Sequence, residues 1–70
     1  MNVIVSAIIA SEDIQNDGRK WVHEVYTDSN KIQYERWYLC KEDFDTDSAL
    51  ADYTVTLNNQ LQMQQNVIGE

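Results

Sequence analysis

The chain has 70 residues and a formal net charge of −7, from 12 Asp and Glu against 5 Lys and Arg. This length allows one domain, residues 1–70, and excludes a multidomain enzyme, because domains usually contain ~100 to 150 residues. The acidic balance argues against direct nucleic-acid binding, because that affinity comes from lysines and arginines that neutralise phosphates.

An apolar run over residues 3–10 predicts the first strand. Its β-branched valines and isoleucines favour the pleated conformation, and its continuous apolar character predicts that both faces are covered. The first basic residue is Arg19, so the run lacks the basic start of a signal peptide. It is also far shorter than the ~20 apolar residues that span a bilayer. We therefore expect neither secretion nor membrane insertion.

Two further strands are predicted downstream. A polar stretch over residues 11–19 contains Asn16-Asp17-Gly18, which is typical of a hairpin connection because Gly18 can adopt positive φ without steric cost. Residues 20–27 and 32–40 are rich in β-branched and aromatic side chains, and a turn at residues 28–31 separates them. The sequence predicts an antiparallel three-stranded meander.

The register of the last two strands can be predicted from charge. A two-residue loop would place Glu24 opposite Glu35, whereas a three-residue loop places Glu24 opposite Arg36. The three-residue loop, residues 29–31, is therefore preferred, because directly opposed like charges repel. The same register gives three more cross-strand pairs: Tyr26 with Tyr34, Val22 with Tyr38, and Trp21 with Leu39.

This register divides the side chains between two faces of the sheet. The tyrosine face carries Val22, Glu24, Tyr26, Tyr34, Arg36 and Tyr38. The tryptophan face carries Trp21, His23, Val25, Trp37 and Leu39. We expect the more apolar tryptophan face to form the core and the tyrosine face to stay partly exposed. Tyrosine and arginine are favoured interface anchors, so the predicted partner-binding residues are Tyr26, Tyr34, Arg36 and Tyr38.

A helix over roughly residues 47–66 follows an acidic segment. Asp45 or Thr46 can cap it, and Asp47 suits the positive end of the helix dipole. The side chains at three- and four-residue spacing form a packing stripe of Leu50, Tyr53, Thr54, Leu57, Leu61, Gln64 and Ile68. Seven of the nine residues from Asn58 to Asn66 are Asn or Gln, so the last turns have little apolar surface of their own.

Metal binding is not expected. Asp43, Asp45 and Asp47 have the alternate spacing that begins an EF-hand loop, where carboxylates converge on calcium. The loop also needs glycine at its sixth position and glutamate at its twelfth, where this chain has Ser48 and Thr54. With one cysteine and one histidine, the chain cannot assemble a zinc set either. We expect no metal and no cofactor.

Catalysis is not expected either. A thiolate beside an imidazolium would be an activated nucleophile, but Cys40 and His23 do not oppose each other in the preferred register. Glu24 and Glu35 could be paired carboxylates for acid–base work, but this register places them on opposite faces. The aromatic residues resemble a single-strand stacking platform, yet such a platform needs a positive groove. Protein contact is the better use of these rings.

The order of the elements points to a group of viral proteins. The residues concerned lie within 18–61 and are Gly18 to Asp28 (GRKWVHEVYTD), then Tyr34, Arg36, Tyr38, Leu39, Ala49, Leu50 and Ala51. This pattern resembles short, mostly uncharacterised proteins encoded among tailed-phage and prophage virion genes. The chain departs from it in having Asn30 where a turn glycine is common and a helix rich in Asn and Gln. The resemblance implies a small structural or accessory phage protein, located in the virion or the host cytoplasm.

The sequence therefore predicts an α+β domain, a three-stranded antiparallel β-meander followed by one C-terminal α-helix packed on the sheet. Its expected role is a non-catalytic protein–protein interaction or structural module that self-associates or binds a larger partner through the tyrosine face and the helix end. The alternative is an acidic inhibitor that mimics DNA towards a host nucleic-acid enzyme. The carboxylates that would replace phosphates are Glu12, Asp13, Asp17, Asp28, Glu42, Asp43, Asp45 and Asp47.

Overall fold

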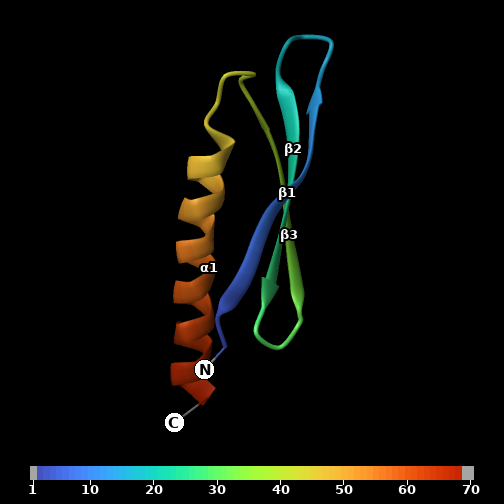
Figure 1. Cartoon of the computed structure of the whole chain (residues 1–70). Helices are drawn as coiled ribbons and strands as arrows, with labels where there is room; N and C mark the ends of the chain where they lie inside the picture. The colour runs from blue at the N-terminus through green and yellow to red at the C-terminus, as the bar shows by residue number, and fades with distance from the viewer. Residues whose placement is uncertain (1, 69–70) are drawn as a thin grey trace.

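The described residues form three antiparallel strands and one helix (Figure 1). The computed structural model describes the backbone of residues 2–68 and the side chains of residues 2–63. In chain order, the elements are β1 (Ile4–Ile14), β2 (Lys20–Asp28), β3 (Gln33–Cys40) and α1 (Thr46–Ile68). The sheet order is β1-β2-β3, so β2 is central, and α1 packs on one face of the sheet. The expected α+β meander with a C-terminal helix is confirmed.

The predicted register of β2 and β3 is confirmed at every proposed pair. Glu24 lies opposite Arg36, and Tyr26 lies opposite Tyr34. The loop closes with Lys31 in the left-handed region at a φ of 68°. A left-handed residue at the third position is typical of three-residue hairpin loops. Charge pairing was therefore sufficient to set this register.

The first strand differs from the prediction. β1 continues to Ile14, and the connection to β2 shortens to residues 15–19, where Gly18 has a φ of 87°. Irregularities between Ile4 and Ser6 and between Ile9 and Ser11 interrupt the β1–β2 pairing. The expectation that both faces of this strand are covered is wrong. β1 is an edge strand with a helix on one face only, which leaves Val5 and Ile8 exposed.

The helix covers the tyrosine face, so the predicted choice of core face is wrong. Val22 and Tyr26 are each 0% exposed, while Trp21 and Trp37 are exposed. The tyrosine ring of Tyr26 packs against Tyr53 of α1 with ring centroids 5.4 Å apart. The polar groups of this face satisfy one another, and the large apolar bodies of its side chains can then be buried.

The helix begins and packs as its sequence predicts. Of the two candidate caps, Asp45 acts, because its Oδ1 accepts a hydrogen bond from the Ser48 backbone N–H at 3.1 Å. Leu57 and Leu61 of the packing stripe are buried. The Oδ1 atom of Asn58 accepts a 2.7 Å hydrogen bond from the Ile4 backbone N–H and so joins α1 to β1. Two further stripe residues, Gln64 and Ile68, lie outside the described side chains.

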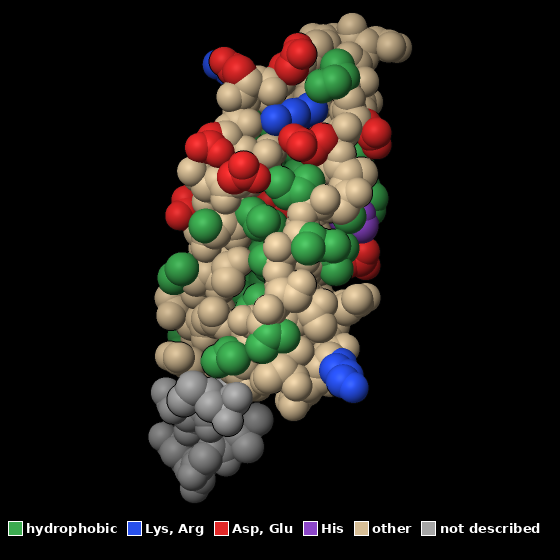
Figure 2. Space-filling model, viewed as in Figure 1, with side chains coloured by type: hydrophobic (Ala, Val, Ile, Leu, Met, Phe, Trp, Pro, Cys, Tyr) green, Lys and Arg blue, Asp and Glu red, His purple; other side chains and the backbone are tan. Residues whose placement is uncertain are grey.

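The molecule is elongated, with principal extents of 50 × 18 × 15 Å. Acidic side chains gather around the N-terminal half of α1 and the adjacent end of the sheet (Figure 2). In the described part of the chain, no helix combines the length and apolar character needed to cross a membrane. α1 itself carries no charged residue after Asp52.

Leu57 provides a test of the helix packing. We expect Leu57→Ala to lower the free energy of unfolding by about 2–5 kcal/mol, because it removes buried methyl groups and leaves a cavity between α1 and the sheet. Val55→Ala is the matched control, since Val55 is on the same helix and 60% exposed. Urea titration of both variants checks the prediction. Equal losses in the two variants would contradict this packing.

Candidate functional site

The interior of the tyrosine face contains a buried carboxylate with three partners. Glu24 is fully buried, and its Oε1 accepts a 2.7 Å hydrogen bond from Nε of Arg36. The hydroxyl groups of Tyr26 and Tyr38 donate to the same carboxylate at 2.5 and 3.0 Å. A buried charge is tolerated when it is paired and hydrogen-bonded, and this one is both. Glu24 is therefore a structural group.

Arg36 connects this carboxylate to the helix. Its guanidinium carbon lies 4.0 Å from the ring centroid of Tyr53 on α1 and 4.7 Å from that of Tyr38. Its Nη2 atom also reaches the backbone carbonyl of Ala49 at 3.5 Å. Arginine suits this position because its planar group can pair with a carboxylate and stack on rings at once. The sheet centre and α1 are thus joined through one side chain.

The pKa values of this cluster reflect its hydrogen bonds. Burial acts to raise the pKa of Glu24, but hydrogen bonds from Arg36, Tyr26 and Tyr38 outweigh burial and hold it below its ordinary value. Burial, followed by the hydrogen bond to Glu24, raises the pKa of Tyr38 to about 12. The same two causes raise the pKa of Tyr26 further. At neutral pH the cluster therefore holds one carboxylate and two neutral phenols.

The predicted partner-binding residues belong to this interior. Tyr26 is fully buried, and Tyr34, Arg36 and Tyr38 are only partly exposed. The hydroxyl of Tyr34 donates to Asp28 at 2.7 Å. The expected partial exposure is found for Tyr34, Arg36 and Tyr38 but not for Tyr26, because α1 covers the face that carries all four side chains. The pairing of Glu24 with Arg36 that predicted the register also indicated that the polar groups of this face can hydrogen-bond to one another. A hydropathy pattern does not show this.

Half of the proposed DNA-mimicking carboxylates are also occupied. Asp28 is buried and accepts hydrogen bonds from the backbone N–H groups of Asn30 and Ile32 at 2.8 and 2.9 Å. Asp17 pairs with Arg19 at 2.6 Å. The other two are Glu12, which pairs with Lys20, and Asp45, which caps α1. Asp28 is buried and cannot replace a phosphate, and the other three already have partners within the fold.

The tryptophan face is left uncovered by the helix. Trp37 is 51% exposed, Trp21 is 39% exposed, and Leu39 is exposed beside them. Ile8 of β1 extends this face through its pairing with Val25. A contiguous patch of large exposed apolar side chains is often a binding surface. This face is the candidate functional site.

The rings of this face are held in a fixed arrangement. The His23 and Trp37 rings are stacked, with centroids 3.8 Å apart and an interplanar angle of 5°. Trp21 lies 6.1 Å from Trp37 at an angle of 30°. His23 Nε2 lies 2.8 Å from Oε1 of Glu35, which orients the imidazole. The aromatic surface is therefore ordered before any partner arrives.

The face is acidic as well as aromatic. Cross-strand pairing forms three adjacent rows: Asp13–Trp21–Leu39, Ser11–His23–Trp37 and Ile8–Val25–Glu35. Asp13 and Glu35 thus stand at opposite corners of the aromatic centre. None of the residues in these rows is a lysine or arginine. The face combines apolar rings with negative charge.

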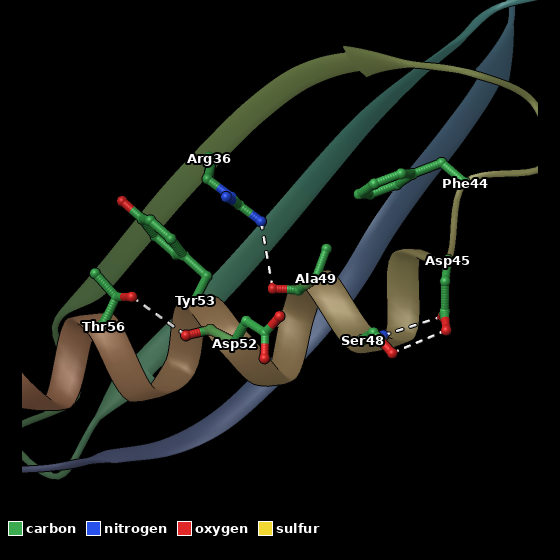
Figure 3. A pocket seen from close by; sticks show the side chains of 8 residues that line it. All are labelled: Arg36, Phe44, Asp45, Ser48, Ala49, Asp52, Tyr53 and Thr56. Atoms are coloured by element: carbon green, nitrogen blue, oxygen red, sulfur yellow. Dashed lines mark hydrogen bonds between the residues drawn. The ribbon is translucent and has the colours of Figure 1, made fainter.

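A second candidate is the pocket between β3 and the N-terminal half of α1, with a volume of ≈ 490 Å³ (Figure 3). Its lining residues are Arg36, Phe44, Asp45, Ser48, Ala49, Asp52, Tyr53 and Thr56. Its strongest polar groups are already used, since Arg36 pairs with Glu24 and Asp45 caps the helix. Within residues 2–63, no group of three or more His, Cys, Asp or Glu could hold a metal ion. The pocket offers no convergent set of ligand-binding groups.

The candidate catalytic pairs are not assembled. Cys40 lies opposite Lys20 and shares the tyrosine face, whereas His23 lies on the tryptophan face. Glu24 and Glu35 are likewise on opposite faces. A β-sheet separates the members of both pairs, because successive side chains of a strand point to opposite sides.

Comparisons with protein-family models, with curated proteins and with solved structures gave no match. The candidate site therefore rests on the geometry of the chain itself.

The buried carboxylate gives a stability prediction. We expect Glu24→Gln to lower the free energy of unfolding by about 2–4 kcal/mol, because Arg36 is then left partly buried without its counter-charge. Glu35→Gln is the matched control, since the Glu35 side chain is 58% exposed, and its change should stay within about 0.5 kcal/mol. Urea titration measures both variants. A similar loss in both would contradict the central role of Glu24.

We also expect stability to fall at both extremes of pH. The pKa of Glu24 is lowered from 4.5, so its contribution is present above pH 4.5 and is lost as the pH falls through the lowered pKa. The pKa of Tyr38 is raised from 10.0 to about 12, so its contribution is present below pH 10.0 and is lost as the pH rises towards 12. Tyr38→Phe should reduce the alkaline loss and keep most of the acid loss, because Arg36 and Tyr26 still hydrogen-bond to Glu24. Urea titrations across this pH range measure the acid and the alkaline loss of stability. An alkaline loss of unchanged size in Tyr38→Phe would contradict the assignment of that loss to Tyr38.

Proposed function

We propose that this chain is a non-catalytic protein–protein interaction module that binds through the tryptophan face. The observation that carries the proposal is the row of exposed, mutually stacked rings centred on Trp37. Aromatic side chains are enriched at protein interfaces because they supply large contact area at a low cost in conformational entropy. The rings here are already fixed in the free protein, which lowers that cost further.

The interior supports the same reading. The buried carboxylates Glu24 and Asp28 are satisfied by groups within the fold, and no buried side-chain polar atom among the described residues lacks a partner. Because these buried polar groups already have hydrogen-bond partners within the fold, none of them requires a ligand as a partner. Large apolar side chains are exposed elsewhere too, among them Val55 and Met63 of α1, but on the tryptophan face the exposed rings lie stacked on one another.

The phage resemblance adds a biological setting to this proposal. The pattern within residues 18–61 supports a place among the small structural or accessory proteins of a phage particle, where binding to another protein is the usual task. Mass spectrometry of purified particles tests this setting. The inhibitor that mimics DNA is less favoured, because half of its proposed carboxylates are engaged within the fold.

Capture experiments test the interaction role. We expect immobilised wild-type protein and the Val55→Ala variant to retain the same proteins from the native source, and Trp37→Ala to lose them, because Trp37 is the central anchor of the face. Val55 is the control because it is exposed on α1, away from the tryptophan face. Circular dichroism verifies that both variants are folded. Identical retention by all three proteins would contradict the assigned surface.

A further inference from the structure

The charge and size of the tryptophan face restrict what can bind there. The chain carries a net charge of −7, and the only full charges in the three cross-strand rows are the carboxylates of Asp13 and Glu35. A second copy would bring the same negative charges to the contact. Opposed like charges are unfavourable, whereas complementary charge increases both specificity and the rate of association.

The area of the face also argues against a symmetric dimer. With β2 contributing 9 residues, at ~3.4 Å per residue and ~4.8 Å between strands, the three strands offer a flat projected area of ~440 Å². Stable complexes between globular proteins bury about 800 Å² per partner. The face is therefore better matched in size to a short segment of a partner than to the flat face of another copy.

We propose that the partner presents a basic extended segment, with two cationic side chains flanking an apolar one. This inference rests on the interaction function proposed above and names the chemistry of the partner. The apolar side chain packs on the rings of Trp37 and Trp21, and the cationic side chains pair with Glu35 and Asp13. Arginine fits best, because its guanidinium can bind a carboxylate and stack on an aromatic ring.

The positions of the two carboxylates set the spacing of the segment. Asp13 and Glu35 are separated by two strands and by two rows, which places their backbones ~16 Å apart. In an extended chain, alternate side chains point to the same side, and residues i and i+4 are ~13 Å apart. Arginine side chains are long enough to make up the difference. The matching pattern is arginine at i and i+4 with an apolar residue at i+2.

Glu35 has an oxygen available for such a contact. Its Oε1 lies 2.8 Å from Nε2 of His23, and its Oε2 makes no hydrogen bond to the described residues. The side chain is 58% exposed, so an incoming guanidinium can reach it without displacing part of the fold. His23 meanwhile holds the carboxylate beside Trp37. The anchor ring and the counter-charge are therefore adjacent.

The chain contains a built-in reporter for the test, because its two tryptophans, Trp21 and Trp37, both lie on this face. The probe is the peptide acetyl-Gly-Arg-Ser-Leu-Ser-Arg-Gly-amide, titrated while intrinsic tryptophan fluorescence is recorded. The control peptide replaces both arginines by citrulline, which has the same shape and no charge. We expect a saturable change with the arginine peptide, at least about five-fold weaker binding of the citrulline peptide, and weaker binding at high salt.

Two variants locate the contact. Glu35→Gln should weaken binding of the arginine peptide by about two- to five-fold, as expected for one exposed ion pair. Asp52→Asn is the matched control, because it removes one carboxylate from α1, on the other side of the sheet. It should leave the affinity unchanged if the contact is local. Equal weakening by both variants would show diffuse attraction to an acidic protein and would overturn the proposal.

Other outcomes also overturn the basic segment and separate it from the interaction function. These are equal binding of the citrulline peptide, no saturable change at millimolar arginine peptide, or a dimer in analytical ultracentrifugation that Trp37→Ala abolishes. If the capture experiment still depends on Trp37 in those cases, the interaction function stands and only the chemistry of the partner is wrong. If capture does not depend on Trp37 while the arginine peptide binds as expected, the basic segment stands as a ligand of this face, and the interaction function tested by capture is wrong.

Discussion

The buried carboxylate of Glu24 determines how the layers of this protein meet. It lies at the centre of β2, where the Arg36 guanidinium and two tyrosine hydroxyls satisfy it. The Arg36 guanidinium in turn stacks on the ring of Tyr53, so the group that pairs with Glu24 within the sheet also holds α1 against the sheet. A carboxylate in this position must be covered with all its partners present, because an unpaired buried charge costs several kcal/mol.

Burial of the tyrosine face leaves the tryptophan face on the outside. A single helix can cover only one face of a sheet, and residues 2–68, which the structure describes, contain no further helix or strand to cover the second face. The consequence is an ordered aromatic surface, with His23 stacked on Trp37, flanked by Asp13 and Glu35. The stability of the interior and the exposure of the tryptophan face therefore have one common cause.

Several features could be predicted from residues alone because they depend on neighbours in the chain or across one hairpin. Repulsion between Glu24 and Glu35 was enough to choose the register, and the spacing of Leu57 and Leu61 was enough to give the packing stripe of the helix. Asp45 was recognisable as a cap because it precedes the helix. Each of these depends on local geometry, which a sequence pattern expresses directly.

The choice of face was decided only by the tertiary structure. Judged by hydropathy, Trp21, Trp37 and Leu39 form the better core, yet they are exposed, while Glu24 and Tyr26 are buried. Hydropathy treats each side chain separately, whereas the cost of burying a polar group depends on whether its partners are buried with it. The sequence by itself determined the order of the elements, the register of β2 and β3, and the helix. The three-dimensional arrangement of donors around one carboxylate decided which side of the sheet became the interior and which became the surface.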